Sequence, residues 1–247
     1  MRGVLHVRDL AIGYGGETLL DELTFDVDRG QVFSILGSLG CGKSTLLRTL
    51  IGLQPPLAGR VHFTGIGPPS AALQPPRFGV VFQSAALFGS LTLLENVLLP
   101  LSKWTDLGRE AAGEVALARL RLVGLARYAH HLPAEVSGGM KKRAGIARAL
   151  ALDPPILFLD EPSAGLDPTV SAELDEWILT LARGLQVTIV LVTHELPSIH
   201  KVSDQCIMLD RDAAGIIARG APRALAESSD ARVQAFFRRM PKARRLS

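Results

Sequence analysis

One stretch of glycines and polar residues limits what this chain can fold into more than any other part of the sequence. It reads Gly37, Ser38, Leu39, Gly40, Cys41, Gly42, Lys43, Ser44 and Thr45, between the apolar runs 32–36 and 46–51. The spacing fits G-x-x-x-x-G-K-[ST], a phosphate-binding loop between a strand and a helix. Glycines let backbone N–H groups point at a phosphate, and the helix start adds its positive dipole end. The simpler alternative is a glycine-rich turn without a ligand. The flanks and the Lys-Ser pair favour a nucleotide, with Lys43 on its β- and γ-phosphates and Ser44 on magnesium.

Composition indicates an ordinary globular chain. It has 247 residues, of which 47% are hydrophobic and 21% charged, which is enough for one sizeable core and a subdomain. The two cysteines, Cys41 and Cys206, make no disulfide framework, so we expect a reducing cytoplasm and no disulfide. No apolar run approaches the roughly 18 residues of a membrane span, so we expect that the chain alone does not cross one.

The positive charge is concentrated at one end. Residues 231–247 hold six basic residues and no acidic one. The rest of the chain has 21 basic and 24 acidic residues, so its formal charge is −3, although the whole chain carries +3. This distribution argues against a nucleic-acid surface over the whole protein. The basic tail, with Phe236 and Phe237 before its last arginines, has three open interpretations: a clasp on a neighbouring subunit, a contact with anionic lipid headgroups, or a solvated, frayed end.

Apolar patterns along the chain predict an α/β fold. Residues 4–11 and 19–27 read as an antiparallel layer, and the runs 32–36, 79–82, 156–159 and 187–192 read as buried parallel strands. Between residues 84 and 152 only helical spacing appears, over 114–122 and 142–152. We predict one domain, a P-loop NTPase (RecA-like) core of mainly parallel sheet with an N-terminal antiparallel β layer and a helical subdomain. The core takes 1–83 and 154–220, the subdomain 84–153, and a basic tail 221–247.

Polar residues follow several of the predicted parallel strands. Gln83 comes after the run 79–82, Asp160 and Glu161 after 156–159, and His194 shortly after 187–192. The carboxyl ends of parallel strands collect on one edge of a sheet, where ligand sites form. We predict that Asp160 and Gln83 bind magnesium, that Glu161 activates the attacking water, and that His194 contacts the γ-phosphate. A loop-capping Gln83 and merely solubilising acids are the simpler alternatives.

Two further stretches contain residues that are unusual for their predicted local structure. Ser137, Gly138, Gly139 and Met140 precede Lys141, Lys142 and Arg143, so a predicted helix opens with cations where its dipole favours acids. We interpret this helix start as facing an anion that the chain itself does not supply, the alternative being a solvated basic face. Tyr14 lies in a predicted turn at 12–16, where its ring either stacks on a purine or packs on the turn.

With these motifs in this order, the chain resembles an ABC-type ATPase over nearly its full length. The resemblance implies a head-to-tail homodimer in which each ATP lies between one subunit's phosphate loop and the other's signature stretch, Ser137 to Met140. It implies ATP and Mg²⁺ as ligands, adenine stacking by Tyr14, catalysis by Glu161, His194 and Gln83, and magnesium binding by Ser44, Gln83 and Asp160. Gly165, Leu166 and Asp167 correspond to the loop that contacts the dimer mate.

The finer resemblance is to the MlaF-like ATPases of MCE-type lipid transporters. It rests on residues 82–88, 137–144 and 230–236. It implies an ATPase at the cytoplasmic face of the inner membrane, bound to permease subunits, that moves phospholipid or a related lipid between envelope membranes. An MCE-domain protein and in some systems a small STAS-domain protein would be further partners. The apolar segment 85–88, ending in Phe88, is the predicted permease contact.

This chain departs from the common ABC pattern at a few positions. Leu39 and Cys41 replace smaller residues of the phosphate loop, and Met140 replaces the usual signature Gln. Because Cys41 lies in the phosphate loop, we expect the ATPase activity to be sensitive to thiol reagents. Two rival functions stay open: the ATPase of another ABC transporter, such as an amino-acid importer, and a soluble ABC-type ATPase acting on DNA or ribosomes.

Overall fold

Two β-sheets organise the computed structural model, which describes residues 3–69 and 76–238. The first is antiparallel, in the order β2-β1-β4. The second has the order β5-β6-β7-β3-β8-β9 and is parallel except for β9. The strands are β1 (Gly3–Tyr14), β2 (Glu17–Asp28), β3 (Val32–Gly37), β4 (Ala58–Phe63), β5 (Gly79–Val81), β6 (Ile156–Asp160), β7 (Thr188–Val192), β8 (Gln205–Asp210) and β9 (Gly215–Gly220).

The parallel sheet is buried on both faces, which is why its strands are continuous apolar runs. Successive side chains of β6 point to opposite faces, so Phe158 packs toward the antiparallel sheet and Leu159 toward the helices on the other side. Phe158 makes an edge-to-face contact with Phe63 of β4, with ring centroids 6.2 Å apart. This aromatic contact ties the two sheets together.

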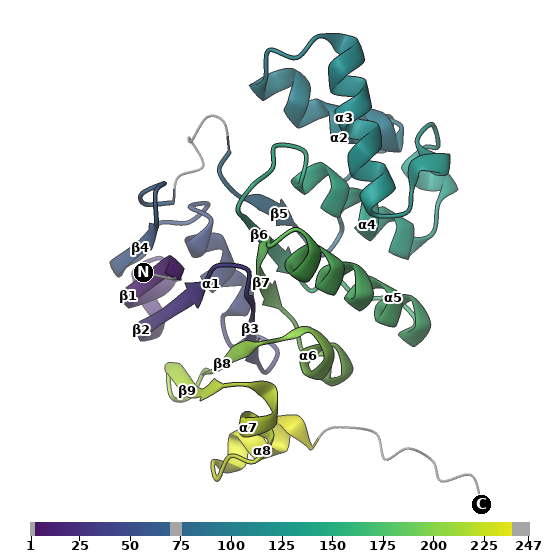
Figure 1. Ribbon diagram of the computed structural model, residues 1–247. Coiled ribbons are helices and arrows are strands. Elements are labelled where there is room, and N and C mark those ends of the chain that lie inside the picture. Colours follow the sequence, from purple (N-terminus) through teal and green to yellow (C-terminus); the bar gives the residue numbers. More distant parts are fainter. Residues whose placement is uncertain (1–2, 70–75, 239–247) are drawn as a thin grey trace, which may run out of the picture.

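Helices cover both faces of the parallel sheet. α1 (Lys43–Leu50) lies in the core between the sheets, whereas α2 (Leu93–Trp104), α3 (Arg109–Leu122), α4 (Gly138–Ala149) and α5 (Pro168–Leu179) pack on the other face. Figure 1 shows α2, α3 and α4 gathered on the far side from the antiparallel sheet. Short helical turns, η1 (Ala126–Tyr128) and η2 (Pro133–Glu135), join α3 to α4, and a π-helical turn, η3 (Thr180–Gly184), continues α5. The remaining helices are α6 (Leu196–Val202), which precedes β8, and α7 (Pro222–Ala226) and α8 (Ala231–Phe237), which follow β9.

The predicted strands are all present, but some boundaries differ. β1 runs on through the residues 12–14 that were predicted as a turn, because register shifts let Gly13 pair with Thr18 and Tyr14 with Glu17. The turn itself is Gly15-Gly16. α4 begins at Gly138, directly after Ser137, whose side chain accepts a hydrogen bond from the Met140 N–H and caps the helix, so the helix starts ahead of the cations and includes the helical spacing seen from residue 142 on.

Helix α2 has no counterpart in the sequence-based assignment. The sequence nevertheless contains a helix-start pattern, because Thr92 and Glu95 form a capping box at the first turn of α2. Pro100 lies inside the helix, and such a proline normally argues against helix. The local cap therefore outweighs the proline.

The solvated-end interpretation of the C-terminal stretch is wrong for the residues that the structure describes. Asp230 caps α8, and Val233, Phe236 and Phe237 are buried against α6 and β8. Because both phenylalanines pack on their own subunit, they are not free to clasp a neighbour or enter a membrane surface. The remaining basic residues of the tail, Arg239, Lys242, Arg244 and Arg245, lie outside the described residues.

Within residues 3–69 and 76–238, no helix combines the length and the apolar character that a membrane crossing requires.

The two cysteines belong to the core, which argues against the expected thiol sensitivity. Cys41 and Cys206 are both buried, and their thiols are free. Burial raises the pKa of Cys41 above its usual value and that of Cys206 to about 12. Since the thiolate is the reacting species, a higher pKa leaves less of it at pH 8.

We therefore predict that native protein reacts slowly with Ellman's reagent at pH 8 and that ATPase activity survives the treatment. In denaturant, where the thiols are exposed, both should react at once. The matched measurement is the absorbance time course with and without denaturant. Rapid labelling of one thiol in the native protein would contradict the buried position of Cys41.

Candidate functional site

The strand order brings the predicted site residues together at one edge of the parallel sheet. β5, β6, β7 and β3 are neighbours in that order. Gln83, the Asp160-Glu161 pair, His194 and the phosphate loop follow their carboxyl ends in the same order. The crevice outside the carboxyl ends is where open α/β sheets bind ligands.

The phosphate loop is shaped around Gly37 and Lys43. Gly37 has φ +148°, and a Cβ there would lie 2.6 Å from the backbone oxygen of Leu209 and 2.5 Å from the sulfur of Cys41, so no larger residue fits. The buried Lys43 ammonium donates hydrogen bonds to the carbonyls of Gly37 and Ser38, both at 3.0 Å. Leu39, at the loop tip, is 100% exposed.

Ser44 and Asp160 face each other across the start of α1 and the end of β6. The Ser44 hydroxyl lies 3.5 Å from Oδ1 of Asp160. Burial and the neighbouring Glu161 carboxylate raise the pKa of Asp160, while Ser44, Arg48 and Lys43 act in the opposite direction. A carboxylate and a hydroxyl close together are oxygen ligands of the kind that Mg²⁺ prefers.

Glu161 is held in a strained conformation beside His194. Its φ is +47°, in the left-handed region that a non-glycine residue rarely adopts, and its N–H donates to the Val192 carbonyl at 2.8 Å. The Nδ1 atom of His194 lies 2.8 and 2.9 Å from the two Glu161 carboxylate oxygens. The pairing of β6 with β7 thus places these side chains in contact, as expected if the strands are neighbours.

Tyr14 stands next to the phosphate loop. Its hydroxyl forms a 2.8 Å hydrogen bond with the hydroxyl of Thr45, and its side chain remains 53% exposed. The aromatic ring is therefore fixed at one end and accessible on its surface. This placement is compatible with the stacking role, which stays a prediction.

The signature stretch and the loop Gly165 to Asp167 lie side by side. A Cβ on Gly138 would come within 3.4 Å of the Leu166 side chain, and a Cβ on Gly139 within 2.3 Å of Val170. Asp167 caps α5 by accepting hydrogen bonds from Thr169 N–H at 3.0 Å and Val170 N–H at 3.1 Å. These starts of α4 and α5 are away from α1, which packs on the opposite face of the parallel sheet.

Two of the three cations at the start of α4 donate hydrogen bonds to backbone carbonyls of their own chain. Lys142 is only 7% exposed, and its ammonium donates a hydrogen bond to the Gln83 carbonyl of the same chain. Arg143 donates to the Val123 carbonyl at 3.3 Å and stacks over Trp177. The long side chains of Lys142 and Arg143 therefore fold back onto neighbouring elements, and an anion at the helix start would be met by Ser137 and the first N–H groups of α4, which stays a prediction.

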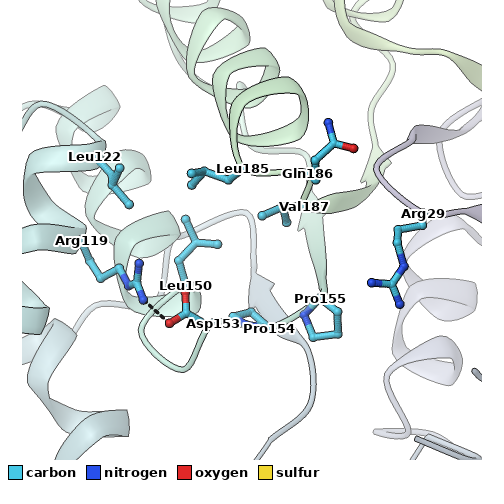
Figure 2. A pocket seen from close by; sticks show the side chains of 10 residues that line it. All are labelled: Arg29, Arg119, Leu122, Leu150, Asp153, Pro154, Pro155, Leu185, Gln186 and Val187. Atoms are coloured by element: carbon cyan, nitrogen blue, oxygen red, sulfur yellow. Dashed lines mark hydrogen bonds and ion pairs between the residues drawn. The ribbon is translucent and has the colours of Figure 1, made fainter. Parts of the chain in front are cut away.

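A separate pocket of about 380 Å³ opens at the opposite edge of the same sheet. Figure 2 shows Arg29, Pro155 and Val187, which precede β3, β6 and β7, lining it together with the Arg119–Asp153 ion pair. Because these residues precede the strands, the pocket is no part of the candidate site.

Comparison with known sequences places these motifs in a family. The model of the ABC transporter family matches residues 20–164, more than half of the chain. The MlaF protein of Escherichia coli K12, an intermembrane phospholipid transport system ATP-binding protein, is 34% identical over 95% of this chain and 88% of its own length. The mkl protein of Mycobacterium leprae, named as a probable ribonucleotide transport ATP-binding protein, is 39% identical over 84% of this chain. The chain spans 61% of the length of that relative.

Solved structures agree with the fold. CbiO1 of Clostridium perfringens, part of the cbiONQ ABC transporter complex, matches with a TM-score of 0.82 and 26% identity over 92% of both chains. The ATP-binding cassette MJ0796, a dimer bound to ADP and Pi, matches with a TM-score of 0.76 and 30% identity over 89% of this chain and 99% of its own. From the family model, the relatives and the motifs at the sheet edge, we conclude that the chain belongs to the ABC transporter ATPase family.

Proposed function

We propose that this chain binds and hydrolyses ATP as the ATPase subunit of a membrane transporter for phospholipid or a related lipid. The single observation that carries the hydrolytic part is the contact between Glu161 and His194 beside the Ser44–Asp160 pair. A carboxylate positioned there can orient and deprotonate the attacking water. His194 fixes that carboxylate and presents its other ring nitrogen to the γ-phosphate.

The oxygen ligands at the site suit Mg²⁺. Ser44 and Asp160 would hold the cation together with the side chain of Gln83, which is exposed at the end of β5. When bound, magnesium neutralises charge on the phosphates. Lys43 and the loop N–H groups from residues 37–45 bind the phosphates, and the Tyr14 ring stacks on adenine.

A second copy of the chain completes the site in this proposal. The exposed residues Ser137, Gly138, Gly165 and Asp167 belong to neighbouring starts of α4 and α5, on the face away from α1. The same chain's α4 is therefore separated from its own phosphate loop by the sheet, whereas a head-to-tail partner brings its signature stretch to the bound ATP. The dimeric MJ0796 cassette supports this arrangement.

The lipid cargo is supported by the MlaF relative, which aligns over nearly the whole chain. We propose the corresponding partners: two permease subunits, an MCE-domain protein and a small STAS-domain protein. The ATPase would lie at the cytoplasmic face of the inner membrane, held there by the permease. For the basic tail, contact with a dimer mate and contact with anionic lipid headgroups both stay open.

A different ABC importer is the second candidate. A Fe(3+) ions import ATP-binding protein, FbpC of Rhizobium etli, is 38% identical over 92% of this chain, although the chain spans 63% of that protein. None of the relatives described above is named for a function on DNA or ribosomes.

The hydrolytic role predicts the behaviour of the Glu161→Gln variant. Without the carboxylate to accept a proton, kcat should fall about a hundredfold to ten-thousandfold, while ATP binding is retained. Phosphate release and equilibrium binding of ATP measure the two quantities. Glu176→Gln is the matched control, since Glu176 pairs with Lys201 on the outside of α5 and should leave kcat unchanged. A Glu161→Gln variant that hydrolyses ATP at the normal rate would refute the assignment.

The cargo proposal predicts the partners that co-purify with the chain. Tagged protein from gently solubilised membranes should bring down a permease and an MCE-domain protein, identified by mass spectrometry. A binding protein for small solutes would favour the importer candidate. Recovery of ribosomes or DNA-bound proteins would refute the transporter proposal.

The permease contact is predicted at Phe88. Its side chain is 57% exposed, while the buried Asn96 holds its backbone through hydrogen bonds to the N–H at 2.8 Å and the carbonyl at 3.1 Å. Phe88→Asp should abolish co-purification of the permease, because it buries a charge in an apolar interface, and should spare ATP binding. Leu185→Asp is the control, an exposed leucine beside the pocket of Figure 2. Unchanged recovery of the permease with Phe88→Asp would place the contact elsewhere.

A further inference from the structure

The loop that follows Gln83 adopts a conformation that its own sequence does not favour. Ala85 and Ala86 have φ values of +60° and +48°, the left-handed region, although neither residue is glycine. Each such residue costs free energy and persists only where its surroundings hold it. Something outside the loop must therefore stabilise residues 83–86.

One face of α4 provides that stabilisation. Lys142, Gly145 and Arg148 are spaced three residues apart and so lie on the same side of the helix. The Lys142 ammonium donates to the Gln83 carbonyl, and the Arg148 guanidinium donates to the carbonyls of Ala85 at 2.9 Å and Ala86 at 2.7 Å. Both cations hold backbone atoms of the loop and leave the Gln83 side chain free.

Gly145 lets the loop come this close. A Cβ at this position would lie 3.2 Å from the Cβ of Ala85 and 3.4 Å from its carbonyl oxygen. That is a tight contact, so the absence of a side chain allows the loop to pack directly on the helix. The three residues form one continuous contact that we call the α4 clamp.

The clamp is also linked to the carboxylates at the end of β6. Burial lowers the pKa of the Lys142 ammonium, and the charges of Asp160 and Glu161 act against that shift. Lys142 is therefore near enough to both carboxylates to feel their charge. The ammonium of α4 thus bonds the Gln83 loop while lying within electrostatic range of Asp160 and Glu161.

We infer that Lys142 and Arg148 are positioning residues that fasten the Gln83 loop to α4, so that loop and signature helix move as one body. The inference rests on the proposed function, in which the start of α4 contacts the partner's ATP and Gln83 contacts its own subunit's magnesium and γ-phosphate. Through the clamp, docking of one subunit's signature stretch on the partner's nucleotide sets the position of Gln83 in the first subunit's site. The two ATP sites of the dimer are thereby coupled through a single helix.

The test compares Lys142→Met and Arg148→Gln with the conservative variants Lys142→Arg and Arg148→Lys in the full-length chain. Arg143→Met is the matched control, because Arg143 is another cation of α4 that donates to a backbone carbonyl, at Val123, outside the loop. Three quantities are measured for each: kcat and KM for ATP, the thermal midpoint, and the hydrogen-exchange rates of the amides of residues 83–88.

Loss of the clamp should lower kcat about tenfold to a hundredfold through misplacement of Gln83, with KM changed less than threefold. Exchange in residues 83–88 should be faster in Lys142→Met and Arg148→Gln and normal in Arg143→Met. Lys142→Arg should recover most of kcat, because it retains a donor and the charge.

Two results would overturn the inference: normal exchange in residues 83–88 when either clamp cation is removed, or an equal loss of kcat in Arg143→Met, which would indicate general destabilisation of α4. The thermal midpoints separate that destabilisation from a local effect. If the unaltered chain hydrolyses no ATP, the proposed function fails, and the exchange rates still decide whether the clamp holds the loop.

Discussion

Burial of the parallel sheet on both faces is the constraint on which the rest of this structure depends. With antiparallel strands and α1 on one side and α2 to α5 on the other, the only open places on the sheet are its edges and strand ends. The order β5-β6-β7-β3 then decides which residues meet. Asp160, Glu161 and His194 are brought together by strand pairing, not by any local sequence preference.

Grouping acids in this way has an electrostatic cost that nearby cations offset. Asp160 and Glu161 are adjacent carboxylates at a partly buried strand end, which is unfavourable for both. Lys43 and Arg48 approach from α1 and Lys142 from α4. Cations from both faces of the sheet therefore converge on the same pair of acids.

The sequence predicted the fold class and the position of the site residues at the carboxyl ends of parallel strands, because both depend on a local pattern or on the rule for parallel strand ends. Which of these strands are neighbours was left open by the sequence and is given by the structure. The sequence did not predict helix α2, which combines a capping box at Thr92 with the helix-disfavouring Pro100. It also did not predict that Lys142 and Arg143 donate hydrogen bonds to backbone carbonyls of their own chain. A helix start rich in cations shows that charge is present, but the reach of a long side chain is decided by packing against other elements. The burial of Cys41 depends in the same way on packing against β8, which is far from it in the chain.

Helix α4 illustrates why such a helix carries more than its signature motif. Its first turn meets the start of α5 at Leu166 and Val170, while its next two turns hold the Gln83 loop through Lys142, Gly145 and Arg148. A rigid helix transmits displacement of one end to the other with little loss, because its backbone hydrogen bonds resist bending. The loop it holds contains two left-handed alanines, which would relax toward ordinary conformations if released. The strained conformation of the Gln83 loop therefore persists because of its contacts with the rigid helix α4.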